Sequence, residues 1–493
     1  MDKNVDHFSS HWPIEDRFRK LPKAFYAAPV GETLGEGSTL IHASPQALKM
    51  VGLDAGAVKR PGFLEIFSGR QPVRGFAPYA TVYAGHQFGH FVPQLGDGRA
   101  YTIAQGRHQD GDWWEVQLKG AGRTPFSRFG DGRAVMRSVI REYLCSEHMA
   151  ALGIPTTRAG SIIATHEGVQ REYIEPGAIM SRIAPTHLRF GHFEYFSHSN
   201  QINYLRLLLD YTVDVFFADL AGQGDPYIAL FNEVVRSTAT LMAAWQAIGF
   251  AHGVMNTDNM SVLGLTIDYG PFGFLDNYDP GFVCNSSDHT GRYAFERQPS
   301  IALWNLQAFA SALLPLCDEG SLREVLARFE PAFKEAYFGL MVKKIGLLTE
   351  ENDDHSLVID LLSVMDKGSV DYTQTFRSLG ALADGGDASA WLSSFGAKMQ
   401  SEIREWLSRY RARLASEVPG SKMGRMNKVN PKYVLRNWVA ETAIKAVEEA
   451  GDLHTLDLVF SVVTKPYEEH PDSEKLSTPP PDHLKGLSVS CSS

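Results

Sequence analysis

The segment HGVMNTDN at residues 252–259, followed by DYG at residues 268–270, decides how the rest of this chain is interpreted. Asp258 and Asn259 are adjacent, and Asp268 comes ten residues after Asp258. Carboxylate and amide oxygens are ligands that Mg²⁺ accepts, and the ion fills its remaining positions with phosphate oxygens and water. Two short loops that carry an Asp-Asn pair and a second Asp can therefore hold a divalent metal ion against a polyphosphate.

The spacing of these residues is similar to that of the catalytic and metal-binding loops of protein kinases, H-R-D-x-x-x-x-N and then D-F-G. Counted from His252, the asparagine falls in register at Asn259, but the place of the catalytic aspartate is taken by Val254. Asp258 is the nearest carboxylate that could accept a proton instead. Asn259 and Asp268 are then candidate metal ligands. The alternative is that these side chains only stabilise Asx turns in a polar loop.

The composition excludes several classes of protein. The chain has 493 residues, 44% of them hydrophobic and 21% charged, which allows two to four domains with a sizeable core. A net charge of −10 without a basic tail argues against nucleic acid as a partner. The first thirteen residues have no apolar core, and charges interrupt the apolar stretch 205–220, so we expect neither a secretion signal nor a membrane span. With only four cysteines, we expect a reducing compartment and hence a cytoplasmic protein, and the absence of C-x-x-C argues against a structural zinc site. We also expect a monomer.

Short strand candidates alternate with glycine turns between residues 80 and 175. The candidates are residues 100–104, residues 114–119, and a hairpin of residues 161–164 with residues 171–174 across a turn at Gly168. A helix is predicted between them, with Asp131 as its N-cap and Gly153 as its end.

Long helices dominate after residue 180. They are predicted at residues 205–221, 229–250, 301–314, 322–348, 388–415 and 433–449. A small α/β part followed by a larger helical part gives an α+β protein with the two-lobe plan of a kinase-like fold. The predicted parts are an irregular N-terminal extension (1–80), an N-lobe (81–178), a C-lobe with both loops (179–350), and a C-terminal helical extension with a polar tail (351–493).

A glycine turn and a lysine are candidates for nucleotide binding. Gly96 and Gly98 flank one residue just before a strand, which lets the backbone approach a phosphate, although the same pattern occurs in ordinary turns. Lys119 ends the second strand about twenty residues later, as a kinase nucleotide lysine does. Glu142 lies on the apolar stripe of the next helix, where a carboxylate needs a cation. We therefore expect Lys119 and Glu142 to form a buried ion pair.

Further anion-binding candidates flank this region. Asp131 and Gly132 precede the predicted helix, whose N-terminal N–H groups can bind an anion. Arg182 and Arg189 fall at the expected junction of the lobes, and the planar arginine fork suits phosphate. From these residues alone, phosphate-binding and structural roles are equally open for both arginines.

The chain resembles the selenoprotein O family of kinase-like pseudokinases over nearly its full length. The resemblance rests on YAGHQFG at 83–89, QLKG at 117–120, GRTPFSR at 122–128, the two loops at 252–259 and 268–270, and NPKY at 430–433. The ending Cys491-Ser492-Ser493 also fits, because many relatives carry selenocysteine at that position. Cysteine there lowers the reactivity expected of the tail.

The resemblance implies transfer of AMP from ATP to Ser, Thr or Tyr hydroxyls of proteins, with the nucleotide reversed relative to a kinase and Mg²⁺ or Mn²⁺ as the metal. Transfer of UMP from UTP is also attributed to bacterial members. The motif match makes Asp258 the proton acceptor and Asn259 and Asp268 the metal ligands. It assigns nucleotide contacts to Gly96, Gly98, Arg99, Lys119, Asp131, Gly132, Arg182 and Arg189.

Two other functions stay open at this point. An ordinary kinase that transfers the γ-phosphoryl group fits the loop layout but not Val254. A non-catalytic ATP-binding scaffold fits the missing base but not the complete metal pair. For the tail, we predict a disulfide between Cys491 and Cys284 that would give redox control, the alternative being an inert terminal cysteine.

Overall fold

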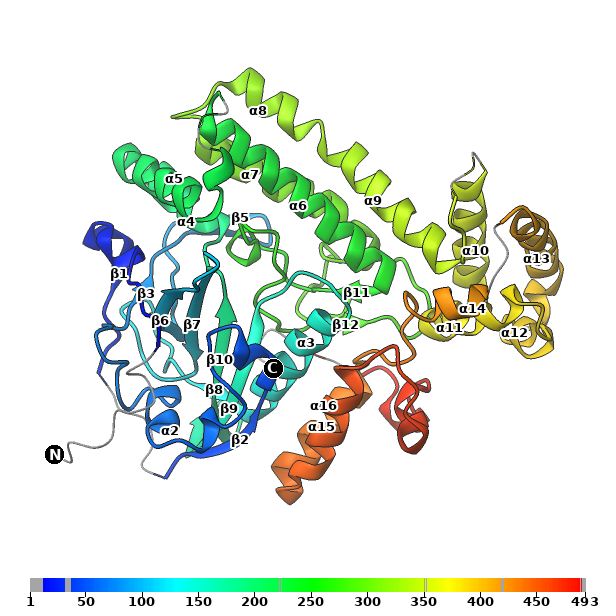
Figure 1. Ribbon diagram of the computed structural model, residues 1–493, viewed down its shortest axis with the longest axis horizontal. Helices are drawn as coiled ribbons and strands as arrows, with labels where there is room; N and C mark the ends of the chain where they lie inside the picture. Colours follow the sequence, from blue (N-terminus) through cyan, green and yellow to red (C-terminus); the bar gives the residue numbers. More distant parts are fainter. Residues whose placement is uncertain are drawn as a thin grey trace.

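The computed structural model describes residues 12–31, 37–220, 222, 224–349, 351, 353–417, 421–487 and 489. Within this part of the chain, a sheet-rich N-terminal region is followed by a helical C-terminal region, which is the α+β order predicted from the sequence (Figure 1). The finer prediction, a kinase-like fold divided near residues 80, 178 and 350, stays a prediction.

The main sheet is antiparallel, with the strand order β2-β9-β10-β7-β6 and with β8 paired to β10 beside this path. Its strands are β2 (Thr39–Ala43), β6 (Ala100–Arg107), β7 (Trp113–Lys119), β8 (Ala134–Val135), β9 (Arg158–Gln170) and β10 (Ile174–Ala184). The β9–β10 hairpin was predicted, but its turn is at residues 171–173 and not at Gly168. Gly168 pairs with Pro176 inside the ladder, so both strands run on past the predicted turn.

The helix α3 (Met136–Ala151) packs against β9 and β10 and is buried on nearly every side. Its other side is covered by α15 (Asn437–Ala450) and α16 (Leu453–Val463), which come from the end of the chain (Figure 1). The Arg141 guanidinium donates to Asn437 Oδ1 at 2.7 Å, and His148 Nδ1 lies 2.7 Å from the Val463 carbonyl. The C-terminal helices thus complete the core of the N-terminal region.

The start of α3 corrects the prediction. Asp131 is not its N-cap, because residues 134 and 135 first form β8 and the helix begins only at Met136. The Asp131 carboxylate instead accepts from the backbone N–H of Arg133 at 2.9 Å, which is a local turn. The end is near the predicted one, since Gly153 follows the C-cap with a φ of 76°.

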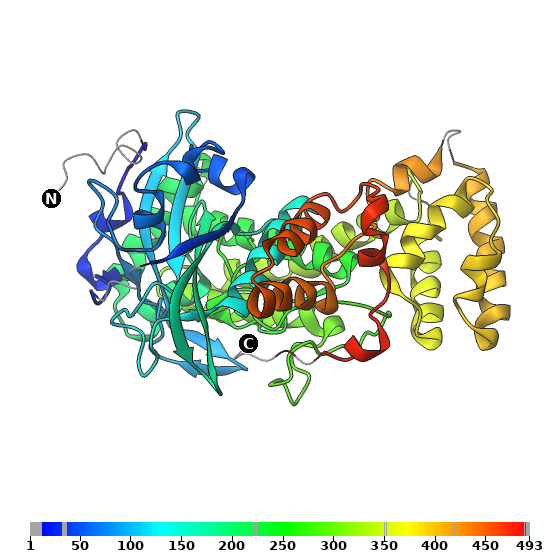
Figure 2. The same cartoon turned by 90° about the horizontal axis from the view of Figure 1, so that it is seen from below.

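The helical region contains two hydrophobic cores. One is continuous with the sheet and includes α15 and α16, and the other is built mainly by the end of α9 and by α10 to α14. Figure 2 shows the group α10–α13 set apart from the sheet. The helices are α4 (Phe190–His198), α5 (Ile202–Phe216), α6 (Pro226–Ile248), α7 (Gln298–Leu313), α8 (Glu319–Leu326), α9 (Phe329–Lys344), α10 (Asp354–Gly368), α11 (Tyr372–Ala383), α12 (Ser389–Ser393), α13 (Gln400–Ala415) and α14 (Lys422–Met426).

Two predicted helices are broken in the structure. The segment 322–348 is divided between α8 and α9, and Pro331 explains the break. Proline is tolerated in the first turn of a new helix but disrupts a continuous one. The segment 388–415 is divided between α12 and α13 at Gly396, which adopts a φ of 69° that a helix does not allow.

The described segments nearest the two ends of the chain form more regular structure than predicted. The segment before residue 80 was expected to be irregular, yet β2 pairs with β9 and forms the edge of the main sheet. The same segment contains β1 (Tyr26–Ala27), paired with β3 (Ala80–Thr81), and the short helices α1 (Pro45–Lys49) and α2 (Phe63–Phe67). After residue 460, α16 continues to Val463, and Leu476 and Val489 are buried against the fold instead of lying extended on the surface.

Small ladders bring the functional loops together. β11 (Phe250–Ala251) pairs with β12 (Gly273–Phe274), so the loops at 252–259 and 268–270 start and end side by side. The hairpin of β4 (Gly85–Gln87) and β5 (His90–Val92) contacts the single 3₁₀ turn Thr257–Asn259. Among the residues described, no helix has the length and apolar character that crossing a membrane requires.

Candidate active site

A cleft of about 770 Å³ lies between the main sheet and the two loops. All the residues predicted to contact nucleotide, to accept a proton or to bind metal line it. They are Gly96, Gly98, Arg99, Lys119, Asp131, Gly132, Arg182, Arg189, Asp258, Asn259 and Asp268. Residues up to 172 positions apart in the sequence therefore share one cavity; what each of them does there stays a prediction.

The sheet side of the cleft carries buried cations. In the antiparallel register Arg182 of β10 lies opposite Gln117 of β7, so its side chain is on the same face as that of Lys119, two residues on. Both cations pair with Glu142 of α3, Lys119 through Nζ and Arg182 through Nε at 2.7 Å from Oε1. Glu142 has no exposed surface, and burial lowers the pKa of Lys119 to about 8 against the attraction of Glu142.

Asp268 is held by two arginines. Arg182 Nη2 pairs with its Oδ1 and Arg189 Nη1 with its Oδ2, while Arg189 Nη1 also donates to the Asp258 carbonyl at 2.8 Å. Burial alone would raise the pKa of Asp268, but the two arginines outweigh it and hold the pKa well below its usual range. The backbone of Asp268 has a φ of 56°, which is rare for a non-glycine residue and is maintained by these contacts.

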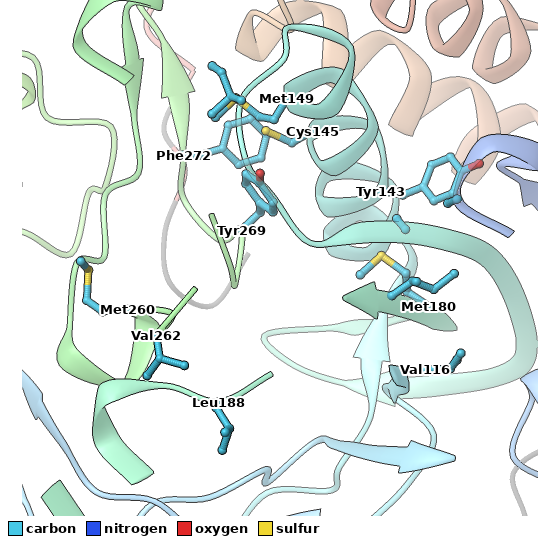
Figure 3. Close-up of a cluster of buried hydrophobic side chains, with 14 of the residues drawn as sticks. Val116, Tyr143, Cys145, Met149, Met180, Leu188, Met260, Val262, Tyr269 and Phe272 are labelled. Carbon is cyan, nitrogen blue, oxygen red and sulfur yellow. The ribbon is translucent and has the colours of Figure 1, made fainter. Parts of the chain in front are cut away.

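The loops are fixed from behind by aromatic and backbone contacts. His252 Nε2 lies 2.8 Å from the Ile267 carbonyl, which ties the first loop to the residue before Asp268. Figure 3 shows Tyr269 and Phe272 beside Cys145 and Met149 of α3. The position of Asp268 therefore depends on the packing of its neighbours against the helix that carries Glu142.

The first loop is also held against the chain that follows β10. The backbone N–H of Phe190 donates to the Met260 carbonyl at 3.0 Å, and that of Val262 donates to Leu188 at 3.2 Å. Leu188, Met260 and Val262 lie on the same side of the close-up in Figure 3. This short pairing sets Arg189 opposite Ser261 and within hydrogen-bond reach of the Asp258 carbonyl.

Asp258 and Asn259 differ in what holds them. The Asn259 Nδ2 group donates to the Val254 carbonyl at 2.9 Å, so the amide oxygen is left for another partner. Gln87 Nε2 donates to Asp258 Oδ2 at 3.1 Å, whereas Oδ1 is buried without a hydrogen bond to any described residue. Burial raises the pKa of Asp258 to about 6, against the opposing contribution of Gln87. A carboxylate with such a pKa is suited to accept a proton near neutral pH.

The glycine turn is built under the loop of residues 120–132. A Cβ on Gly96 would collide with the Phe126 ring, and one on Gly98 would lie 2.9 Å from the Phe126 carbonyl. Thr124 Oγ1 donates to the Asp97 carbonyl at 2.6 Å and fixes the turn from the same side. The glycines are thus required by close packing of the chain itself, and Arg99 beside them makes no ion pair with the residues described here.

The opposite rim holds Asp131 and Gly132. Arg171, in the β9–β10 turn, donates to Asp131 Oδ2 at 2.8 Å and to the Arg133 carbonyl at 3.0 Å. Neither Arg171 nor Gln87 was predicted as a site residue. Gln87 lies in the segment YAGHQFG, so the motif itself could have indicated it, but no spacing in the sequence points to Arg171.

The predicted disulfide is only half within the described residues, because Cys491 lies outside them. Cys284 is buried, and its Sγ is 3.5 Å from the Ala251 carbonyl at the base of the first loop. The backbone N–H of Ser286 donates to the Val489 carbonyl at 2.9 Å, so the chain reaches the neighbourhood of Cys284 two residues before Cys491. The disulfide stays a prediction.

A cleft with a lysine, several arginines, the buried Asp258 and the partly buried Asp268 is the kind of site in which enzymes neutralise a polyphosphate and transfer part of it. The family model described as "Protein adenylyltransferase SelO" matches residues 10–464. Among curated relatives, "Protein nucleotidyltransferase YdiU" of Myxococcus xanthus (strain DK1622) is 48% identical over 484 residues, covering 97% of this chain and 98% of the relative.

Two further relatives carry the same description. The protein of Thioalkalivibrio sulfidiphilus (strain HL-EbGR7) is 46% identical over 486 residues, and that of Vibrio vulnificus (strain YJ016) is 44% identical over 485 residues. Each match covers 97% of this chain and 98% of the relative. The chain belongs to the SelO family of protein adenylyltransferases, and it is accordingly a nucleotidyltransferase enzyme.

Proposed function

We propose that this chain transfers AMP from ATP to a Ser, Thr or Tyr hydroxyl of a protein, within a kinase-like cleft that binds the nucleotide in reversed orientation. The observation that carries the proposal is the meeting of Lys119, Arg182 and Arg189 with Asp258 and Asp268 in one cleft. The family description supports AMP as the transferred group. The alternative that we propose is transfer of UMP from UTP. We expect the enzyme to act as a cytoplasmic monomer on other proteins.

The transfer step needs positioning and neutralisation more than covalent help. The acceptor hydroxyl gives its proton to the Asp258 carboxylate, and its oxygen forms a bond to the α-phosphorus. The bond from that phosphorus to the bridging oxygen breaks, and pyrophosphate leaves with the electron pair. Lys119 and the arginines neutralise the charge that develops on the leaving phosphates.

The reversed orientation is favoured by the depth of the two arginines. Arg182 and Arg189 are almost completely buried, so a phosphate that reaches them lies at the floor of the cleft. A terminal phosphate there leaves the α-phosphate nearer the mouth, where a protein hydroxyl can approach. In this arrangement the terminal phosphate replaces the Asp268 carboxylate as the partner of the two guanidinium groups. Guanidinium groups bind phosphate as well as carboxylate.

The residues present fit a divalent metal ion bound together with the nucleotide. Among the described residues no group of three or more His, Cys, Asp or Glu side chains could hold a metal by itself. Asn259 and Asp268 offer one amide and one carboxylate oxygen, the pair of hard ligands that Mg²⁺ or Mn²⁺ combines with phosphate oxygens. The ion would supply further neutralisation of the phosphates. We assign these two residues as its ligands.

Labelled nucleotides distinguish this function from its alternatives. The purified chain is incubated with a mixture of bacterial proteins and with ATP labelled at either the α- or the γ-phosphate, and the same is done with α-labelled UTP. Label from the α-phosphate on protein is expected. Label from the γ-phosphate alone would show that the chain is an ordinary kinase. No label from any of these nucleotides would support the alternative of a non-catalytic nucleotide-binding scaffold.

A redox function of the tail is proposed separately. A bond between Cys284 and Cys491 would fasten the C-terminus next to the base of the first loop, because Cys284 contacts Ala251 there. Mass spectrometry of the oxidised, non-reduced protein should detect the crosslinked peptide. Free thiols at both Cys284 and Cys491 under those conditions would contradict the proposed disulfide.

A further inference from the structure

We propose that Gln87 is a positioning residue, which orients the Asp258 carboxylate toward the acceptor hydroxyl. The inference rests on the proposed transfer, in which Asp258 accepts the proton. Gln87 Nε2 donates to Asp258 Oδ2 at 3.1 Å, although the two residues are separated by 171 positions. Both side chains line the cleft. Gln87 is thus in contact with the proposed base, and it would act through Asp258 and not on the substrate itself.

The other carboxylate oxygen is fixed by shape. Oδ1 of Asp258 is buried without a hydrogen-bond partner in the described chain, and it faces Gly85, where an added Cβ would collide with it. A planar carboxylate that is confined at one oxygen and hydrogen-bonded at the other has one orientation. Oδ2 then keeps a second lone pair, which can accept the hydroxyl proton while Gln87 remains bound.

The backbone that carries Gln87 is joined to the loop of Asp258 on one side. The N–H of His86 donates to Thr257 Oγ1 at 2.7 Å, and Thr257 Oγ1 donates to Glu194 Oε2 at 2.7 Å. The His86 ring lies 2.9 Å from the other oxygen of Glu194. The residues that precede Gln87 and Asp258 are therefore fastened to the same buried carboxylate of α4.

A second set of contacts fastens the other side. The N–H of Phe88 donates to Asn256 Oδ1 at 3.2 Å and to the Tyr293 hydroxyl at 3.1 Å. Phe88 has a φ of 50°, a conformation that a non-glycine residue keeps only where its surroundings impose it. With His86 and Phe88 both tied to the loop, Gln87 has little freedom, which is what a group that sets the angle of a base requires.

Two substitutions separate hydrogen bonding from space filling. Gln87→Leu keeps much of the volume without a donor, and Gln87→Glu keeps the length but places an acceptor where the donor was. In both variants we expect the rate at saturating ATP to fall about 10- to 100-fold while KM for ATP is unchanged, because only the orientation of the base is lost. Gln94→Leu is the matched control, since Gln94 is exposed and does not line the cleft.

The assay uses the full chain, α-labelled ATP and one fixed mixture of bacterial proteins, with Tm measured for each variant. A rate loss in both variants at unchanged KM and Tm supports the positioning role. A wild-type rate in Gln87→Glu, or a loss that appears in KM or in Tm instead, overturns it. If the wild-type chain itself transfers no AMP, the proposed function fails, and that outcome is distinct from an active enzyme that tolerates both substitutions.

Discussion

Asp258 and Asp268 lie in the same cleft on neighbouring loops, yet their surroundings displace the two pKa values in opposite directions. Asp268 is gripped by Arg182 and Arg189, and its pKa is held well below the usual range. Asp258 has one amide donor and an unpaired oxygen, and burial raises its pKa to about 6. Pairs of carboxyl groups separated in this way divide the work of a site, one as a permanent charge and one as a proton acceptor.

The largest effect is expected from removing the permanent charge. Asp268→Ala takes away a proposed metal ligand and the carboxylate that pairs with both arginines, of which Arg182 keeps a second partner in Glu142, so AMP transfer should fall by about 10³-fold or more. Transfer from α-labelled ATP measures this. Asp268→Asn, which keeps the shape, should be almost as inactive, and wild-type activity in either variant would contradict the role of Asp268.

Asp258→Asn tests the proposed proton acceptor, and we expect a smaller loss of activity than for Asp268→Ala. The amide keeps the size of the side chain but cannot take a proton, so the rate at saturating ATP should fall about 10²- to 10⁴-fold. Calorimetric titration should show that ATP still binds as it does to the wild-type chain. An unchanged rate would mean that the proton leaves by another route.

Glu142→Gln tests the support of the cationic side. Lys119 and Arg182 lose a shared carboxylate, and the free energy of unfolding should decrease by about 3–5 kcal/mol because Lys119 is left as an unpaired buried cation, whereas Arg182 keeps its ion pair with Asp268. Transfer should slow at least about tenfold. Urea denaturation and the labelling assay measure the two effects, and Glu172→Gln, exposed in the β9–β10 turn, is the control expected to change neither.

The pH dependence of the transfer rate tests the difference between Asp258 and Asp268 in the wild-type chain. The ionised form of Asp258 is the active one, so its raised pKa predicts that activity is lost as the pH falls through about 6. Below that value the rate should fall about tenfold for each pH unit, and above it the rate should level off. Asp268 stays ionised throughout, because its pKa lies far lower. A profile that is flat down to about pH 4.5 would contradict the assignment of the base.

The smallest effect is expected at the rim. Arg171→Ala removes a partly exposed ion pair with Asp131, and such pairs contribute up to about 1 kcal/mol. KM for ATP should therefore change by no more than about fivefold, with the rate at saturating ATP unchanged. A large fall in that rate would show that the rim takes part in the transfer step itself.

The sequence predicts those features that follow from local chemistry. The order of sheet and helices is one of them, and the pairing of Lys119 with Glu142 is another, because a carboxylate on the buried face of a helix requires a cation. The structure has this pair. The spacing in the sequence also predicts that Asp258, Asn259 and Asp268 lie close together, and all three line the cleft, although their roles stay predictions.

What the sequence does not predict depends on contacts between distant segments. The pairing of β2 with β9 requires residues 39–43 to meet residues 161–164, and a five-residue strand carries little signal of its own. The delayed start of α3 follows from the pairing of β8 with β10. The contact of Gln87 with Asp258 spans 171 positions, so no local pattern contains it.

The cover that α15 and α16 give to α3 has a consequence for synthesis of the protein. The helix that carries Glu142 leaves the ribosome well before the residues that shield its outer side, 437–463. A nascent chain that still lacks α15 and α16 cannot complete the packing around α3. A chain that terminates before these helices leaves the outer side of α3 exposed. The packing around Glu142 is thus complete only after residue 463 has been synthesised.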